Sequence, residues 1–236
     1  MSSRHIAFLG ASTGVGLGAL KHSLKAGHQC VALCREPKKL DDLQAPNLKV
    51  VKGNAHDLAI VSQLITAPNG TFVDEIITTI GGKFSTAKMG IDQPQVCELG
   101  MDTLVAAITA LRKAGVTGAP HIVACSSTGV SKFGRDLPVL MLPLYMALKG
   151  PHADKVKMEE KLLASGEQFT VVRPSLLTNG ESETVVRAGI EDPKTGFESK
   201  AIGYTISRED AGKWIARNLV QDMDAAYMNK MVVITY

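Results

Sequence analysis

The sequence predicts an α/β protein built on a doubly wound parallel sheet. Short apolar runs rich in β-branched residues alternate with amphipathic helical patterns along most of the 236 residues. A glycine-rich turn joins the first apolar run directly to the first helical pattern, as at the first strand–helix junction of such sheets. The chain shows no internal repeat or linker, so we expect a single domain over residues 1–236.

The elements follow from these runs in order. Gly10 ends the first strand, a helix then reaches Lys25, and a second long helix is expected over 94–114. Beyond residue 175 the rhythm changes, and we expect a small substrate-covering elaboration over 175–236. It would contain short strands near 184–187 and 201–206, a helix capped by Ser207 that reaches about residue 221, and a final strand at 231–235. The strands expected before residue 175 are 5–9, 29–33, 48–51, 75–80, 121–125 and 169–173.

Composition narrows the class of protein. Lys and Arg number 26 against 23 Asp and Glu, an excess too small to predict a nucleic-acid partner. No apolar run is long enough to cross a bilayer, and the first residues lead straight into a strand without a signal-peptide pattern. The four cysteines form no Cys-x-x-Cys pair, and the six histidines do not cluster at metal-ligand spacing. We expect a cytoplasmic protein with buried free thiols, no metal and no membrane partner.

The strongest chemical signal is the loop between the first strand and the first helix, LGASTGVG at residues 9–16. Gly10 permits the tight turn, Gly14 lets the backbone approach a pyrophosphate, and Gly16 lets the helix pack closely on the strand. Free amide groups at the helix start favour negative charge. In this strand–turn–helix context the loop predicts a Rossmann-type dinucleotide site.

The residues after the second strand indicate which dinucleotide binds. An NAD-binding protein places an acidic residue there to hold the ribose 2′-hydroxyl. This sequence has Arg35 followed by Glu36, with Lys38 and Lys39 close behind. Because Arg35 can pair with a 2′-phosphate, we expect NADPH as the cofactor, although Glu36 could bind a hydroxyl.

At this point the motifs resemble those of a known family, the NAD(P)H-binding, NmrA-like atypical short-chain dehydrogenases/reductases, and within it the biliverdin-IXβ and flavin reductases. The resemblance spans nearly the whole chain. It is carried by FLGASTGVG, VALCREPKKL, VVKGNAHD, LVAAITALRKAGV, HIVACSST, MEEKLLASGEQFTVVRPSLL and ISREDAGKWIA.

The resemblance implies roles for individual positions. Arg35 with Lys39 would hold the 2′-phosphate, and Asn54 and Ala55 would lie beside the adenine. Gly81 and Gly82 would pass the nicotinamide ribose. Ser126, Ser127, Pro174 and Leu176 would face the nicotinamide, and the pyrophosphate would lie on Gly10, Ser12, Thr13, Gly14, Val15 and Gly16. In these relatives the loop usually reads Gly-Ala-Thr-Gly-x-x-Gly, whereas here Thr13 takes a glycine position.

The proton donor stays open at the sequence level. A Tyr-x-x-x-Lys match occurs at Tyr145 and Lys149. Counting back from Ser165 and Gly166, however, the resemblance puts the family's lysine position at Lys155 and its tyrosine position at Pro151. We expect Ser127 to position the substrate and the proton to come from Tyr145 or solvent. Lys155 would touch the ribose or form a surface salt bridge. The apolar stretch 137–148 could line the substrate pocket, form a core helix or make a dimer face.

These observations predict an NADPH-dependent oxidoreductase that transfers a hydride to a small conjugated or aromatic substrate. A flavin, quinone, tetrapyrrole or secondary-metabolite ketone would suit it. The alternatives are a non-catalytic NADP(H)-sensing regulator of the NmrA kind, and a non-redox enzyme on the same scaffold. The protein is expected to be a monomer or a homodimer.

Overall fold

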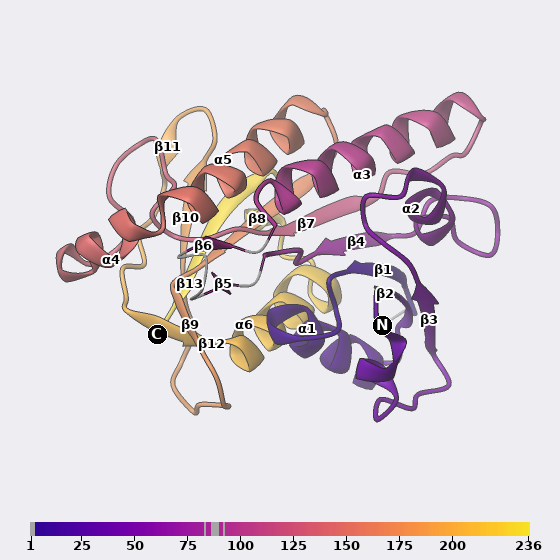
Figure 1. The fold of residues 1–236 in the computed structure, drawn as a ribbon, viewed down its shortest axis with the longest axis horizontal. Coiled ribbons are helices and arrows are strands. Elements are labelled where there is room, and N and C mark those ends of the chain that lie inside the picture. The colour runs from indigo at the N-terminus through magenta and orange to yellow at the C-terminus, as the bar shows by residue number, and fades with distance from the viewer. Residues whose placement is uncertain (1–2, 83, 86–89, 92) are drawn as a thin grey trace.

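A nine-stranded sheet forms the centre of the molecule (Figure 1). The computed structural model describes residues 3–82, 84–85, 90–91 and 93–236. Seven neighbouring strands are parallel, and two further strands extend the sheet antiparallel at one edge. In spatial order the strands are β11 (Gly196–Phe197), β10 (Arg187–Asp192), β13 (Lys230–Thr235), β8 (Phe169–Pro174), β7 (His121–Cys125), β4 (Glu75–Thr78), β1 (His5–Leu9), β2 (Gln29–Cys34) and β3 (Leu48–Lys52).

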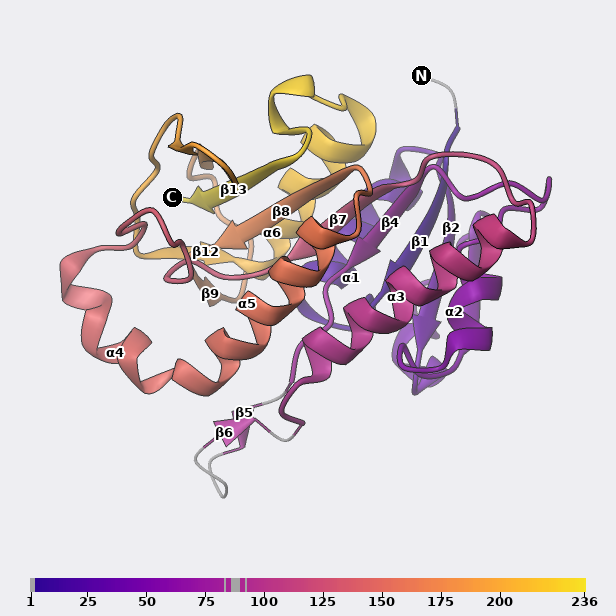
Figure 2. The same ribbon diagram turned by 90° about the horizontal axis from the view of Figure 1, so that it is seen from above.

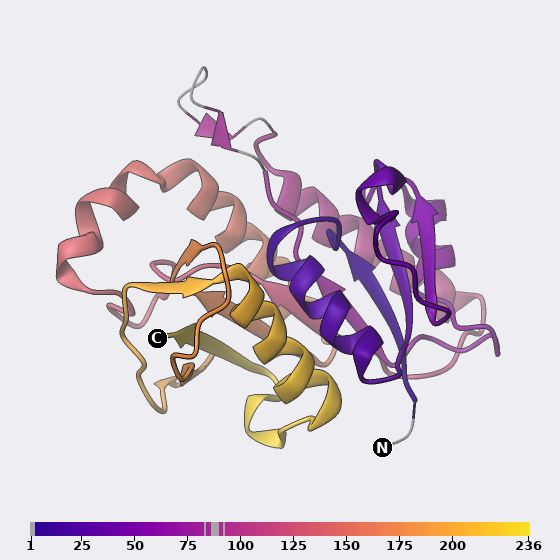
Figure 3. The same cartoon turned by 90° about the horizontal axis from the view of Figure 1, so that it is seen from below.

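Helices cover both faces of this sheet, which confirms the doubly wound architecture. Figure 2 shows α2 (Leu58–Leu64), α3 (Val96–Lys113) and α5 (Lys149–Ala164) across one face. Figure 3 shows α1 (Gly14–Lys25) and α6 (Arg208–Ile215) across the other, where α6 continues into a π-helical segment, η4 (Ala216–Gln221).

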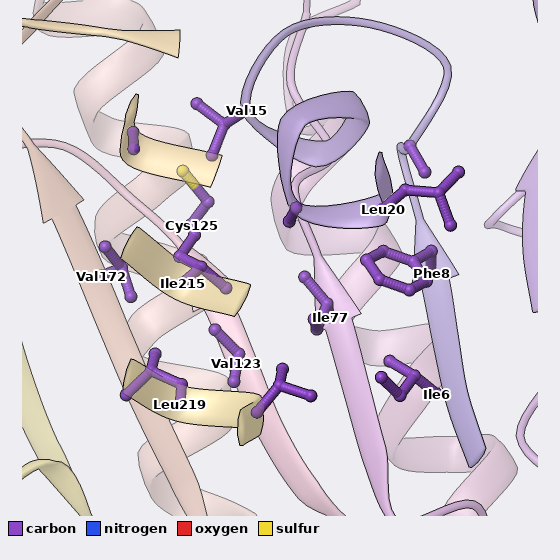
Figure 4. Packing of buried hydrophobic residues seen from close by; sticks show 14 of the residues in the cluster. Ile6, Phe8, Val15, Leu20, Ile77, Val123, Cys125, Val172, Ile215 and Leu219 are labelled. Carbon is purple, nitrogen blue, oxygen red and sulfur yellow. The ribbon is translucent and has the colours of Figure 1, made fainter. Parts of the chain in front are cut away.

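Successive side chains of a strand point to opposite faces of the sheet, so the protein has a hydrophobic core on each face. In β1, Ile6 and Phe8 pack toward α1 and α6, while Ala7 and Leu9 pack toward α2 and α3. Figure 4 shows the first of these cores, in which Ile215 and Leu219 lie against the strand residues. Strands buried on both faces read as continuous apolar runs, which is why they could be located from the sequence.

Two strands predicted in the C-terminal part are misplaced. The run 184–187 has two β-branched apolar residues at its centre, yet Val185 is exposed. Strand β10 begins only at Arg187, because Arg187 is the first residue with a partner on β13, Thr235. Similarly, the strand expected over 201–206 is β12 (Thr205–Ser207), which starts where Thr205 pairs with Leu176 of β9 (Leu176–Thr178). The starts of β10 and β12 are therefore determined by where their partner strands, β13 and β9, can pair with them.

Within 175–236, strands β10, β11 and β13 and helix α6 belong to the main layers. Strand β13 lies inside the sheet between β8 and β10, and α6 packs on α1. The helix predicted from Ser207 is confirmed: the Ser207 hydroxyl accepts a hydrogen bond from the Asp210 amide, and the helical segment ends at Gln221. The remaining short elements are η1 (Pro37–Leu40), β5 (Phe84–Ser85), β6 (Gly90–Ile91), η3 (Val139–Met141), α4 (Leu142–Ala147) and η5 (Ala225–Tyr227). None of the helices in the described ranges is both long and apolar enough to cross a membrane.

The stretch 137–148 is not a core helix. It forms η3 and the short helix α4, and Leu140 and Met146 are 80% and 62% exposed. Helix α5 begins at Lys149, so Gly150 and Pro151 lie in its first turn rather than before it. Proline is tolerated there because a first-turn amide has no helical acceptor.

Candidate active site

A cleft of about 530 Å³ opens at the carboxyl ends of the parallel strands, where the strand order reverses between β1 and β4. The glycine loop, the end of β2, the segments after β3 and β4, the end of β7 and one turn of α5 all line it. It therefore brings together segments far apart in the chain, as a doubly wound sheet requires.

The glycine loop forms one wall of the cleft. Gly10 and Gly14 have φ values of +94° and +62°, which favour glycine. A Cβ atom on Gly10 would lie 2.9 Å from the Thr79 carbonyl carbon, and one on Gly16 would collide with the Thr79 side chain. The Thr79 hydroxyl also donates a 3.0 Å hydrogen bond to the Gly10 carbonyl. This contact locks the loop against the end of β4.

The first turn of α1, which continues the glycine loop, presents its backbone amides to the cleft. Thr13 stands at the N-cap position without a side-chain capping bond, and the first turn contains no acidic residue. Ser12, Thr13, Gly14 and Val15 all line the cleft. Backbone N–H groups and the positive end of the helix dipole at this point favour a bound anion such as a phosphate.

Positive charge surrounds the cleft more than negative charge. Arg35, Lys39, Lys155 and Arg208 line it, against a single lining carboxylate, Glu36, among the described residues. That carboxylate lies 2.9 Å from the Lys39 ammonium, so these two charges offset each other. Arg35 is exposed, and its guanidinium donates a long 3.4 Å hydrogen bond to the neutral Gln93 amide oxygen. Arg35 is thus the cation at the end of β2 that can pair with an anionic ligand.

The α5 side of the cleft is built around Lys155. Its ammonium donates to the carbonyl of Ile80, at 2.9 Å, and to that of Cys125, at 2.7 Å, and so bridges the ends of β4 and β7. The neighbouring Asp154 carboxylate accepts hydrogen bonds of 2.9 Å from the Cys97 and Glu98 amides at the start of α3. Because Asp154 fixes α5 against α3, Lys155 is directed into the cleft. It is not a surface salt-bridge partner.

Two serines follow β7. Ser126 lines the cleft, and its buried hydroxyl has no hydrogen-bond partner within the described part of the chain. The hydroxyl of half-buried Ser127 lies 3.5 Å from Nε2 of His152, which stands on α5 one turn before Lys155. Burial lowers the pKa of the His152 imidazole from its ordinary value.

The Tyr145 and Lys149 pair does not assemble. The two residues lie on separate helices, α4 and α5, which meet at Leu148, so their spacing does not place them on one helical face. Lys149 is exposed, while Tyr145 is buried with its hydroxyl 2.8 Å from the Thr128 hydroxyl. Burial raises the Tyr145 pKa, with the Thr128 hydrogen bond opposing that effect.

Most residues singled out from the sequence do meet at the cleft, and a few do not. Gly16 lies behind the loop, and Ser127, Tyr145, Pro174 and Leu176 lie outside the lining. Leu177 lines the cleft in place of Leu176. The predicted residues found in the lining are Gly10, Ser12, Thr13, Gly14, Val15, Arg35, Lys39, Asn54, Ala55, Gly81, Gly82, Ser126 and Lys155.

Sequence reasoning missed Arg208, at the start of α6. A Cβ on Gly14 would lie 3.5 Å from the Arg208 side chain, so the two face each other across the glycine loop. Its guanidinium donates to the Leu177 and Thr178 carbonyls at 3.2 and 3.0 Å and to the Asn179 side chain at 2.8 Å. All three acceptors are uncharged, so the guanidinium charge remains available to an anion. The signal in the sequence is Gly212, which lets α6 approach α1.

Residues 10–235 match the sequence profile of the NAD(P)H-binding family. The chain belongs to this family. The match confirms the family predicted from the motifs. Among curated proteins, the chain is 37% identical to "Reductase pytE" of Aspergillus terreus, covering 98% of this chain and 97% of that protein. It is 32% identical to "Oxidase pynE" of Aspergillus niger, covering 100% and 99%.

Solved structures with low sequence identity to the present chain have the same fold. A short-chain dehydrogenase/reductase of Veillonella parvula, determined in complex with NADP, aligns with a TM-score of 0.72 at 15% identity, over 100% of this chain and 95% of that one. ChuY, an anaerobillin reductase of Escherichia coli O157:H7, aligns with a TM-score of 0.67 at 19% identity, over 98% and 96%. These likenesses confirm the Rossmann-type fold.

The residues present fit a nicotinamide dinucleotide. The glycine turn and the uncapped start of α1 offer amides to a pyrophosphate, and a Cβ on Gly81 would meet no atom within 4 Å, so space remains above this segment. The unpartnered Ser126 hydroxyl, judged within the described residues, supplies a hydrogen-bonding group at the far end of the cleft. The adenosine end of the cofactor would therefore lie near Arg35 and its nicotinamide end near Ser126.

Proposed function

We propose that this protein is an NADPH-dependent reductase that delivers a hydride to a small conjugated or aromatic substrate. The observation that carries the proposal is the charge around the cleft: Arg35 faces it beyond β2, and the nearby Glu36 carboxylate is paired with Lys39. A guanidinium at this point pairs with a 2′-phosphate, which NADPH has and NADH lacks.

The roles of the residues follow from their places in the cleft. The amides of Ser12 to Val15 hold the pyrophosphate, with the Arg208 guanidinium on its open side. Asn54 and Ala55 border the adenine, and Gly81, Gly82 and Lys155 border the nicotinamide ribose. The bound nicotinamide would supply the hydride. Ser126 orients the ring, Leu177 borders its far side, and Ser127, just outside the lining, orients the substrate.

The substrate class is inferred from the helices that precede α5, the helix that carries Lys155. Exposed apolar side chains gather on η3 and α4, among them Leu140, Leu144 and Met146. Such side chains contact flat, conjugated molecules well. The names of the two Aspergillus relatives, a reductase and an oxidase, support redox chemistry at this site. Flavins, quinones, tetrapyrroles and secondary-metabolite ketones are the compounds to test.

The experiment is NADPH oxidation with purified protein and a panel of FMN, phenanthrenequinone and biliverdin, followed by the loss of nicotinamide absorbance. Turnover with NADPH well above that with NADH supports the proposal. A second candidate, an NADP(H)-sensing regulator, is favoured by the separation of Tyr145 from Lys149. Equal affinity for NADP⁺ and NADPH with no turnover of any acceptor would support the regulator instead.

A further inference from the structure

His152 is a titratable side chain beside Ser127 that the functional roles above leave unused. It stands three residues before Lys155 on α5, so the two side chains project from the same face of the helix, one turn apart. Lys155 lines the cleft, and in the proposed binding mode it borders the nicotinamide ribose. Figure 2 shows that the start of α5, which carries His152, points away from the glycine loop toward α4.

The neighbours of His152 are a hydroxyl and an aromatic ring. Its Nε2 atom lies 3.5 Å from the Ser127 hydroxyl, a long contact of the kind that tightens when a ligand binds. Its ring centroid lies 5.2 Å from that of Tyr145 on α4. Burial is the cause of its lowered pKa, and among the described residues Ser127 and Tyr145 are the polar or titratable groups that contact it from the adjoining elements.

Tyr145 is poorly placed to give up a proton itself. Its hydroxyl is hydrogen-bonded to the Thr128 hydroxyl at 2.8 Å, and the side chain is only 7% exposed. A Cβ on Gly129 would come within 2.5 Å of the Tyr145 ring, so the ring packs directly on the Gly129 backbone. The Tyr145 ring is therefore held in place by packing and lies against the His152 ring.

We propose that His152 is the proton source for the reduction and passes its proton to the substrate through the Ser127 hydroxyl. This inference rests on the reductase function proposed above. Ser127 contacts the substrate and His152 acts through it, so His152 is a positioning and relay residue. The substrate it serves is one whose reduced atom needs a proton, such as a quinone or ketone oxygen.

The hydride transfer and the two proton transfers occur in one step. As the substrate carbon accepts the hydride from NADPH, the π pair of its carbon–oxygen bond moves to the oxygen. The Ser127 O–H bond breaks and its proton joins that oxygen, while the Nε2 proton of the His152 imidazolium replaces it on Ser127. NADPH is oxidised by two electrons and the substrate is reduced by two. Half-buried His152 then regains a proton from water.

The kinetic test compares His152→Ala, His152→Gln and Ser127→Ala, with phenanthrenequinone as the acceptor. His22, also half-buried with a pKa lowered by burial but located on α1, provides the matched control His22→Ala. His152→Ala should lower kcat about 100-fold while the KM for NADPH stays near its original value. Added imidazole should restore part of this rate in His152→Ala, and His22→Ala should keep the original rate.

The pH profile separates a relay from a structural role. Because the acid form of His152 is needed, kcat should fall as pH rises through the His152 pKa, which lies below its ordinary value. His152→Ala and His152→Gln should lose this dependence, although the glutamine can still bond to Ser127. A rate loss that imidazole does not restore, with the pH dependence retained, would overturn the relay.

A measurement without turnover tests the same geometry. In an NMR titration of the imidazole carbon-bound protons, NADP⁺ should shift the His152 signal and its pKa, and Ser127→Ala should shift them too, whereas the His22 signal should not move. A His152 signal insensitive to both changes would overturn the proposal. If the unaltered protein oxidises NADPH with none of the acceptors, the reductase function itself fails, whereas full activity in His152→Ala refutes the relay alone.

Discussion

Replacing Arg35 with alanine should weaken NADPH binding about tenfold and leave NADH binding nearly unchanged. The Glu36 carboxylate already neutralises Lys39 at 2.9 Å, so the Arg35 guanidinium is the charge that discriminates the 2′-phosphate. A hydrogen bond to a charged group contributes about 1.5–3 kcal/mol, and the exposure of Arg35 places this contact at the lower end of that range, about 1.5 kcal/mol. That loss corresponds to about a tenfold change in the dissociation constant.

Titration calorimetry with NADPH and NADH at low and high salt measures this difference. The Arg35 contribution should shrink at high salt because an exposed ion pair is screened. Arg217→Ala provides the control, since Arg217 is an exposed arginine on η4 whose nearest carboxylate, on Asp222, is 3.8 Å away. Equal losses of NADPH and NADH affinity in Arg35→Ala would refute the assignment of Arg35 to the 2′-phosphate.

Three further predictions concern other parts of the molecule. Arg208→Ala should weaken NADPH and NADH alike, by about fivefold or 1 kcal/mol, because the pyrophosphate is common to both; calorimetry that shows a loss for NADPH alone would contradict this. Arg173→Met should lower the free energy of unfolding, measured in urea, by about 3–5 kcal/mol, because it leaves the buried Glu159 and Glu191 carboxylates without their ion-pair partner. Arg112→Met, at a more exposed ion pair, should lower it by less than about 1 kcal/mol. Burial raises the thiol pKa of Cys30 to about 12 and of Cys97 to about 11, so neither should react with a disulfide reagent at mildly alkaline pH until the protein unfolds; rapid labelling of the native protein would show that the core opens.

The strands and the cleft were predictable because local pattern and topology act together. Runs such as His5–Leu9 are buried on both faces, and their apolar character marks them directly. Once a parallel sheet is inferred, its carboxyl ends must lie at one edge. Arg35 and Ser126, which follow β2 and β7, could therefore be assigned to one site, whereas the sequence left Lys155 open between a ribose contact and a surface salt bridge.

Long-range packing explains what the sequence did not reveal. Arg208 reaches the glycine loop because α6 crosses α1 at Gly18 and Gly212, where a Cβ on Gly212 would come within 2.5 Å of the α1 backbone. A glycine such as Gly212 indicates that another backbone can approach closely, but it does not indicate which helix does so. Likewise, the choice of Leu177 over Leu176 depends on how β9 pairs with β12, because successive residues of a strand point in opposite directions.

The proton relay proposed for His152 could not be predicted from the sequence for a different reason. The spacing of Tyr145 and Lys149 matches a known pattern, but a pattern of this kind has meaning only on a continuous helix, and the chain turns at Leu148. His152 is close to Ser127 because α5 starts earlier than its glycine and proline indicated.

The position of β13 has a consequence for biosynthesis. Residues 230–235 occupy an interior place in the sheet, between β8 and β10, and form hydrogen bonds on both sides. During translation, β10 and β11 leave the ribosome first, yet they have no neighbour in the main sheet to pair with until this later segment follows. The growing chain therefore carries an open sheet edge at β8, which a chaperone can protect until the sheet is completed.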